Sequence, residues 1–299
     1  MIAQQILNGV ITGSIYALFA LGFTLVFSVH RVLNLAHGGV FMVSALFAYY
    51  LVTSGVSIWV AAVAAALAGG VVSGLIEIVA LRRLRRFPPH VMEFAALITT
   101  LGADIVIINI GHKLTDAQTV RFPFGTFPNV FFNLLGLRIS FLQIAVLLTV
   151  GAMLLFLMYY LYRTPVGLKL RAVASSEKAA RLMGVNPDAV YLQTFFISGV
   201  MAGIAGVLIA LSFNSISAHM GEPYMLKAFV IIVLGGLGSI PGCVMAAIFF
   251  GVAQTLCVVY LPPGAPDIIL YSLLFLVLLV KPSGLMGSAA AISIVGRRA

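Results

Sequence analysis

Three polar side chains interrupt apolar segments of this sequence and are its first candidates for chemistry. Asn34 and His37 belong to the stretch NLAHGG, and Asp104 lies near the middle of an apolar run. Amide, imidazole and carboxylate groups in such surroundings are costly, and they typically line a water-filled pathway or pair with one another. Asn34, His37 and Asp104 are therefore candidate pathway residues.

Each of these side chains also has a structural interpretation. Asn34 can cap a helix start at the membrane surface, with His37 at the level of the lipid headgroups. Asp104 can pair with Asn109 instead of facing a cavity. No second ligand lies at a suitable spacing from His37, so the sequence predicts no metal site.

A short charged stretch, ASSEKAARLMGVNPDAV at 174–190, has the pattern of an amphipathic helix. Ser175 or Ser176 can cap it, and Glu177 then lies in the first turn, where the helix dipole favours an acid. Gly184 marks its end, because glycine readily adopts the left-handed conformation found there. The apolar face of this helix consists of Ala179, Leu182 and Met183. So short a helix is marginal in water, which predicts a partner surface; a solvated loop is the alternative.

The motifs of membrane-embedded enzymes are missing from the sequence. It contains no H-E-x-x-H zinc motif, no pair of catalytic carboxylates and no nucleophile elbow. GGLGSIPG at 235–242 has the glycines of a phosphate loop, but no Gly-Lys pair completes a Walker A motif. We therefore predict that the chain is not an enzyme, needs no cofactor and takes no energy from nucleotide through its own residues.

The composition indicates an integral membrane protein. Apolar residues make up 62% of the 299 residues, charged residues make up 8%, and the mean hydropathy is +1.15. This leaves too little polar surface for a soluble globule. The net charge of +9 does not indicate a nucleic-acid partner, because the cations gather at the ends of apolar runs. The expected fold class is all-α, in a polytopic protein whose residues 1–299 form one domain in the lipid bilayer.

Nine apolar runs approach the length of about 20 residues that crosses a bilayer core. They lie near 5–29, 38–54, 57–81, 94–111, 139–162, 190–212, 225–238, 242–260 and 267–280. An arginine cluster at 82–86 marks the end of the third run as cytoplasmic, and Glu77 is expected to pair with it. The N-terminus is then periplasmic, whereas segment 163–189 and the C-terminus are cytoplasmic. Nine crossings are predicted; eight with one broken or re-entrant segment is the alternative.

Two segments indicate an inverted repeat. NGVITGSIYALFAL at 8–21 and SGVMAGIAGVLIAL at 198–211 share Gly, Val, Gly, Leu, Ala and Leu in register. The predicted topology runs these segments in opposite directions, as an inverted repeat requires. Coincidence is the alternative, because Gly, Ala, Val and Leu dominate this sequence.

Four stretches resemble the permease subunits of branched-chain amino acid ABC transporters, and are closer to the first of their two permease types. They are GSIYALFALGFTLVFSVHRVLNLAHGGVFMVSA at 13–45, TPVGLKLRAVASSEKAARLMGVNPDAV at 164–190, LKAFVIIVLGGLGSIPGCVMAAIFFG at 226–251 and KPSGLMG at 281–287. They occur in the family's order and span most of the chain. Two features depart from the family: segment 112–138 matches nothing in it, and Asp104 replaces a residue that is usually uncharged.

The resemblance implies a role for the charged stretch and a set of partners. Its helix is similar to the coupling helix that inserts into a groove on an ATP-binding subunit. The expected coupling residues are Ser176, Glu177, Ala179, Ala180, Leu182, Met183 and Gly184. The implied importer of the bacterial inner membrane contains two permease subunits (identical or paralogous), two ATP-binding subunits that use the ATP, and a periplasmic substrate-binding protein. Branched-chain or other hydrophobic amino acids are the expected substrates; a urea or short-chain amide importer and a secondary transporter are the alternatives.

Overall fold

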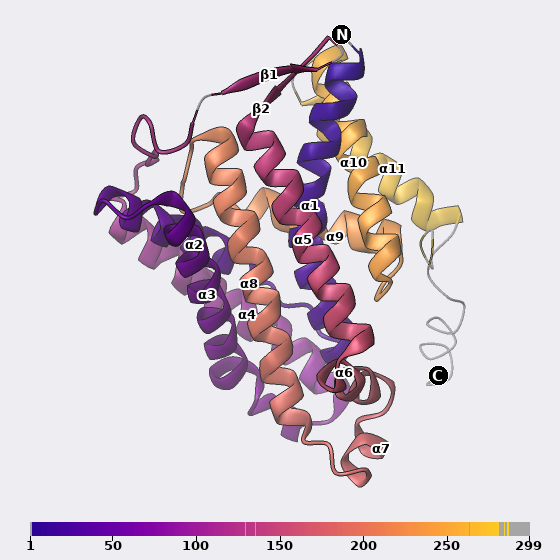
Figure 1. Cartoon of the computed structure of the whole chain (residues 1–299). Coiled ribbons are helices and arrows are strands. Elements are labelled where there is room, and N and C mark those ends of the chain that lie inside the picture. Colours follow the sequence, from indigo (N-terminus) through magenta and orange to yellow (C-terminus); the bar gives the residue numbers. More distant parts are fainter. Residues whose placement is uncertain are drawn as a thin grey trace.

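The protein is built mainly from long helices that lie side by side, as Figure 1 shows. This computed structural model describes residues 2–128, 130–134, 136–262, 264–280, 284 and 286. The α-helices are α1 (Ile2–His30), α2 (His37–Thr53), α3 (Ile58–Ile76), α4 (Pro89–Leu114), α5 (Phe141–Arg163), α6 (Pro165–Ser175), α7 (Glu177–Leu182), α8 (Pro187–Phe213), α9 (Gly221–Gly235), α10 (Ile240–Tyr260) and α11 (Ala265–Val280). A π-helical segment (Glu77–Leu81) and a 3-10 turn (Leu84–Arg86) extend α3.

Each of the nine predicted apolar runs falls on a helix, but these helices differ in length. Among the described residues, six helices are long and apolar enough to cross a membrane: α1, the extended α3, α4, α5, α8 and α10. The helices α2, α9 and α11 have 17, 15 and 16 residues. The polytopic helical architecture is confirmed, and the count of nine crossings stays a prediction.

One segment corrects the all-α prediction. Strands β1 (Phe131–Leu134) and β2 (Leu137–Ser140) form an antiparallel hairpin between α4 and α5. Gly136 has a φ of 78°, which glycine adopts without strain, and it allows the tight reversal between the strands. The Gln4 side chain ties the hairpin to the start of α1 by two hydrogen bonds with the Arg138 backbone, each 3.0 Å long. Four-residue strands are too short to produce a periodic pattern, so the sequence does not reveal them.

The helices α1 and α8 form the centre of the bundle. In the most apolar window of each helix, 78% of the residues of α1 and 72% of those of α8 are buried, against 17% for α4 and for α5. Gly9 and Gly13 of α1 lie against the backbone of α10, and Gly199 and Gly203 of α8 lie against α3. Lipid tails are as apolar as the helix surfaces, so the hydrophobic effect does not drive helices together within the bilayer. Close packing between small residues holds them together instead.

Two of the shorter helices begin inside the bundle instead of at one of its ends. The chain turns back at Arg31. At the start of α2, the His37 ring contacts the carbonyl of Phe19, which lies eleven residues before the last residue of α1. At 1.5 Å per residue this is about 16 Å from that end. The helix α9 starts beside it, because a Cβ on Gly221 would lie 2.2 Å from the Gly38 carbonyl oxygen. The first residues of α2 and α9 are therefore in contact within the bundle.

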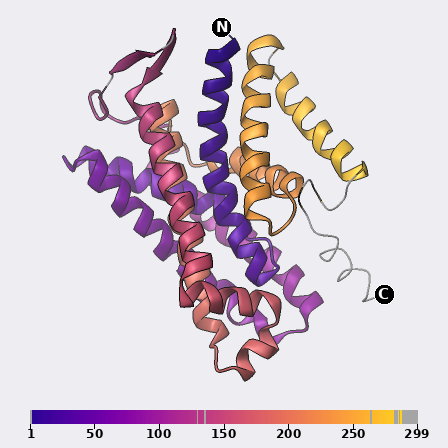
Figure 2. The ribbon, with the colours of Figure 1, turned by 45° about the vertical axis from the view of Figure 1, so that its right-hand side comes forward.

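The two ends of the bundle carry different elements. The start of α1 and the hairpin lie at one end, and α6 and α7 lie at the other, in both Figure 1 and Figure 2. Arg82 and Arg85 lie 3.7 and 3.5 Å from the Asp188 carboxylate at the start of α8. The arginine cluster and segment 163–189 therefore share one end, as the predicted topology requires. Met1 and residues 287–299 lie outside the described residues.

Candidate functional site

The helix α6 precedes the charged stretch and is not among the helices predicted from the sequence. The signals for α6 are present in the sequence: Thr164 accepts a hydrogen bond from the Gly167 N–H at 3.1 Å, and Pro165 occupies the first helical position. Ser176 then ends α6 and caps α7 by accepting a hydrogen bond from the Ala179 N–H at 3.3 Å. Of the two predicted caps, Ser175 and Ser176, the structure has Ser176, and Ser175 is the last residue of α6.

The helix α7 ends at the glycine that the sequence pattern indicates. Gly184 has a φ of 79°, and its N–H donates to the Arg181 carbonyl at 3.0 Å. The next N–H, of Val185, donates to the Ala180 carbonyl at 3.0 Å. These two bonds form a Schellman motif, which satisfies carbonyl groups at the helix end. A Cβ at position 184 would meet no atom within 4 Å, so the backbone conformation, and not crowding, requires glycine.

The helix α7 lies at the tip of a segment that projects from the bundle (Figure 1), and the apolar side chains at this tip are exposed. Leu182 and Met183 are 89% and 84% exposed, and Ala179 is exposed as well. Ala180 is buried where α7 packs on α6 and α8. Glu177 accepts two hydrogen bonds from the Arg181 guanidinium, at 2.8 and 3.2 Å, which support the helix at i,i+4 spacing. This arrangement suits insertion of the helix tip into a groove of another protein.

Asn34 and His37 lie deep inside the protein at the start of α2. Asn34 is 1% exposed, and neither polar atom of its side chain has a hydrogen-bond partner within the described residues. The buried His37 ring places Nε2 3.1 Å from the Phe19 carbonyl oxygen and Nδ1 3.5 Å from the Ser198 hydroxyl of α8. His37 therefore joins α1, α2 and α8.

Asp104 approaches the same helix start from α4. Its Oδ1 accepts a hydrogen bond of 2.8 Å from the N–H of Gly39, the third residue of α2. Ala36 occupies the cap position of α2 and provides no side-chain cap, so the Asp104 carboxylate takes that role from the neighbouring helix. Asn109, the alternative partner, donates instead to the Ile105 carbonyl. The three candidate pathway residues thus all lie near the start of α2.

A polar contact between α7 and the membrane helices escapes sequence reasoning. The Tyr191 hydroxyl on α8 donates a hydrogen bond of 3.0 Å to Glu177 on α7. A tyrosine near the end of an apolar run carries no sequence signal for such a partner, which follows only from the fold. The pairing of Glu77 with the arginine cluster, in contrast, is confirmed, because Arg85 donates a hydrogen bond to the Glu77 carboxylate.

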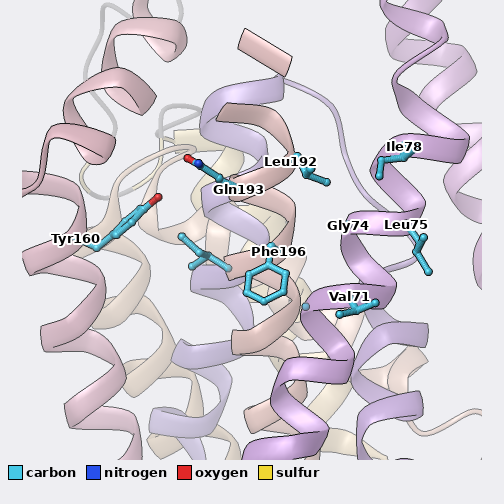
Figure 3. A pocket seen from close by; sticks show the side chains of 10 residues that line it. Val71, Gly74, Leu75, Ile78, Tyr160, Leu192, Gln193 and Phe196 are labelled. Atoms are coloured by element: carbon cyan, nitrogen blue, oxygen red, sulfur yellow. The ribbon is translucent and has the colours of Figure 1, made fainter. Parts of the chain in front are cut away.

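A groove of about 460 Å³ lies between α3 with its π-helical extension, α5 and α8, and its lining includes none of Asn34, His37 and Asp104 (Figure 3). Residues of α3 and α8 face each other across it, and Tyr160 of α5 borders it. Its lining is formed by Gly70, Val71, Gly74, Leu75, Ile78, Tyr160, Leu192, Gln193, Phe196 and Ile197. An amino acid carries two charges, which this nearly apolar lining does not match, so the groove better suits an acyl chain.

The chain is a polytopic membrane protein of long apolar helices packed through glycines, with a polar helix start among them and a helix that projects from one end. The family model described as "Branched-chain amino acid transport system / permease component" matches residues 5–279. The chain belongs to this family of permease components. It is therefore a transport subunit and not an enzyme.

Individual relatives agree with this assignment. The chain is 32% identical over 296 residues to the high-affinity branched-chain amino acid transport system permease protein LivH of Escherichia coli (strain K12), with 95% of each chain covered. It is 31% identical over 299 residues to the corresponding permease protein BraD of Pseudomonas aeruginosa, again with 95% of each covered. It is 26% identical over 300 residues to the probable branched-chain amino acid transport permease protein LivH of Methanocaldococcus jannaschii, covering 95% of this chain and 92% of the relative. No solved structure matches the chain.

Proposed function

We propose that this protein is the membrane permease subunit of an ATP-driven importer for branched-chain or other hydrophobic amino acids. Family membership over residues 5–279 and the substrate named for LivH and BraD support the substrate class. The observation that carries the coupling role is the exposure of Leu182 and Met183 on α7. The sequence has no Walker A motif, so separate ATP-binding subunits supply the energy.

The magnitude of burial supports α7 as a docking element. Complete burial of a leucine or methionine side chain is worth about 1.5–3 kcal/mol. Leu182 and Met183 are both almost fully exposed in the isolated subunit, so a groove that covers them gains roughly 3–6 kcal/mol. A few such side chains dominate the affinity of a typical interface. Ser176 and Gly184 fix the two ends of α7 and so present these side chains in one geometry.

The proposed complex contains two copies of the permease, or this chain and a paralogue, with two ATP-binding subunits and a periplasmic substrate-binding protein. We place it in the bacterial inner membrane, with the α7 end in the cytoplasm and the hairpin end in the periplasm. The grouping of the 82–86 arginines with segment 163–189 at one end supports this orientation. The binding protein then meets the end that carries the hairpin and the start of α1.

We also propose nine membrane segments, in which α1–α4 and α8–α11 form an inverted repeat and α5 is the additional segment. The two central helices support this arrangement by packing in reciprocal ways. Gly9 and Gly13 of α1 contact α10, the third helix of the second unit, whereas Gly199 and Gly203 of α8 contact α3, the third helix of the first. The second helices, α2 and α9, both begin inside the bundle, where inverted-repeat transporters typically place their substrate sites.

Asn34, His37 and Asp104 are proposed to border the pathway when the complex opens. Their position at the meeting point of α2 and α9 supports this role, and so does the unpaired amide of the buried Asn34. Buried polar groups nearly always have a partner, so an unpaired amide in the bundle is available to a polar ligand.

The coupling role is tested with two substitutions in the 176–184 segment. Ala179→Glu introduces a charge on the face that docks, and Gly184→Val introduces a β-branched residue at a φ of 79°. Neither residue lies in a membrane span, so membrane expression is expected to stay normal. Co-purification of the ATP-binding subunits and stimulated uptake of leucine are expected to be lost.

Two matched substitutions serve as controls. Ala189→Glu adds the same charge at an exposed position of α8, and Gly125→Val adds the same side chain at a φ of 84° in a loop at the opposite end. Both controls are expected to assemble and to transport leucine. If Ala179→Glu and Gly184→Val assemble and transport as well as the controls, the coupling role of α7 is refuted.

A further inference from the structure

A buried ion pair lies directly behind the coupling helix. Glu77 is 1% exposed and accepts a hydrogen bond from Arg85, whose side chain is 11% exposed. Glu77 begins the π-helical segment at the end of α3, where the Arg82 N–H donates to the Glu77 carbonyl at 2.8 Å. Such π-helical turns interrupt the regular helix and are frequent at functional sites. The pair therefore fixes the irregular end of a membrane helix.

Tyr191 lies between this ion pair and α7. The Arg85 guanidinium carbon is 4.5 Å from the centroid of the Tyr191 ring, close enough for a cation–π interaction. The Tyr191 hydroxyl donates to Glu177 of α7, and the His30 ring at the end of α1 lies 4.2 Å from the Tyr191 ring. One side chain of α8 thus contacts α7, the arginine cluster and the end of α1.

We propose that Tyr191 and Arg85 are positioning residues that transmit movement of α7 to the end of α3; this inference rests on the proposed coupling function. The path runs from Glu177 through the Tyr191 hydroxyl and ring to Arg85, and from Arg85 to Glu77. The helix α7 packs mainly on α6 and α8. The path is a polar connection through which the end of α3 senses the position of α7. Asp188 at the start of α8 adds a second set of contacts, to Arg82 and Arg85.

The chemistry of these contacts suits a connection that is either made or broken. Glu77 and Arg85 are largely shielded from water, so separating them leaves a buried charge without its partner, which is strongly unfavourable. The hydrogen bond from Tyr191 to a charged acceptor is directional and is lost when the donor and acceptor move apart by about 1 Å. A displacement of α7 therefore alters the surroundings of Arg85 in a discrete step, and conformational coupling requires such two-state elements.

Tyr191→Phe is the main test, because it removes the hydroxyl and keeps the ring beneath Arg85. The assay uses the complete complex reconstituted in lipid, with ATP hydrolysis measured with and without substrate-loaded binding protein. We expect normal assembly and normal basal hydrolysis, with stimulation of hydrolysis and leucine uptake reduced about tenfold, which corresponds to ~1.4 kcal/mol of lost coupling. Tyr159→Phe is the matched control, because Tyr159 is 63% exposed and lies near the C-terminal end of α5. Stimulation of ATP hydrolysis in this control variant is expected to be unchanged.

A double-mutant cycle separates transmission from simple stabilisation. Tyr191→Phe removes the donor of this hydrogen bond, and Glu177→Ala removes its acceptor together with the bonds from Arg181. The double variant is therefore expected to lose no more coupling than Glu177→Ala alone. Additive losses in the cycle, or a loss of assembly that matches the loss of stimulation, would overturn the inference. Normal stimulation in Tyr191→Phe would overturn it as well. If Tyr191→Phe is normal while Ala179→Glu abolishes assembly, only the connection fails; if Ala179→Glu is itself normal, the proposed coupling function fails.

Discussion

Replacement of Gly199 by alanine tests the packing at the centre of the bundle. Gly199 lies on α8 where this helix crosses α3. A Cβ at this position would lie 2.3 Å from the Gly69 carbonyl oxygen and 2.5 Å from the Ser73 Cβ. The carbonyl belongs to the backbone of a helix and cannot rotate out of the way. The two helices must therefore move apart to accept a single methyl group.

The size of the effect follows from these distances. Ordinary contacts of a Cβ begin at 3.4 Å, so α3 and α8 must separate by about 1 Å, which forfeits a quarter to a half of the attraction between the facing atoms. Overpacking of this kind costs about 1–3 kcal/mol, and the rigid backbone contact favours the upper end. Alanine regains up to ~1 kcal/mol of helix propensity. The expected net loss is about 2 kcal/mol in the free energy of unfolding.

Gly151→Ala provides the matched control on α5. A Cβ at Gly151 would meet no atom within 4 Å, so this variant is expected to gain up to ~1 kcal/mol. Unfolding of the purified chain by sodium dodecyl sulfate in mixed micelles measures both variants under the same conditions. The two alanines should differ by about 3 kcal/mol. Equal stability of the two variants would refute the close contact between α3 and α8.

Three further predictions concern the cap, the topology and the energy source. Asp104→Ala removes the acceptor for the Gly39 N–H and is expected to lower the free energy of unfolding by about 1–2 kcal/mol, whereas Asp104→Asn keeps an acceptor oxygen and most of the stability. Equal stability of the two variants with loss of uptake would instead assign Asp104 to the pathway alone. With Cys243 and Cys257 replaced by alanine, a cysteine at Lys178 is expected to react only from the cytoplasm and one at Phe124 only from the periplasm; labelling of position 178 from the periplasm would contradict the proposed orientation. The isolated chain is expected to hydrolyse no ATP, and uptake by the complete complex is expected to survive an uncoupler; uptake that needs no ATP-binding subunit and stops with the uncoupler would support a secondary transporter.

Local patterns account for the parts of the site that the sequence reveals. The charged stretch contains both its helix start signal and its helix stop signal. Ser176 can cap a helix and Gly184 can end one, whatever lies around them. Both predictions are confirmed because these interactions are complete within about ten residues of chain. The ion pair of Glu77 with the arginine cluster is predictable for the same reason, since its partners lie eight residues apart.

Tertiary structure decides the features that depend on distant residues. Sequence hydropathy treats α2 as an ordinary crossing, but its start lies inside the bundle, where His37 binds a carbonyl of α1 and Asp104 of α4 caps its third residue. From the sequence, Asp104 is predicted to face a cavity or to pair with Asn109. Its role as a cap is not predictable, because nothing near Asp104 in the chain indicates that α2 lacks a cap of its own. Tyr191 has no local signature at all.

The sequence by itself determined that this chain is a helical membrane protein, because the apolar run length is fixed by the thickness of the bilayer. It also determined the limits of α7 and, through four stretches that resemble one family, the permease assignment that the match over residues 5–279 establishes. Only the tertiary structure decided which distant polar groups meet: His37 with the Phe19 carbonyl and Asp104 with the Gly39 N–H at the start of α2, and Glu177 of α7 with Tyr191, which also lies against Arg85. The physical reason is that the cap at Ser176 and the stop at Gly184 act within a few residues of chain, whereas the pairing of buried polar groups depends on which helices the packing of small residues brings together.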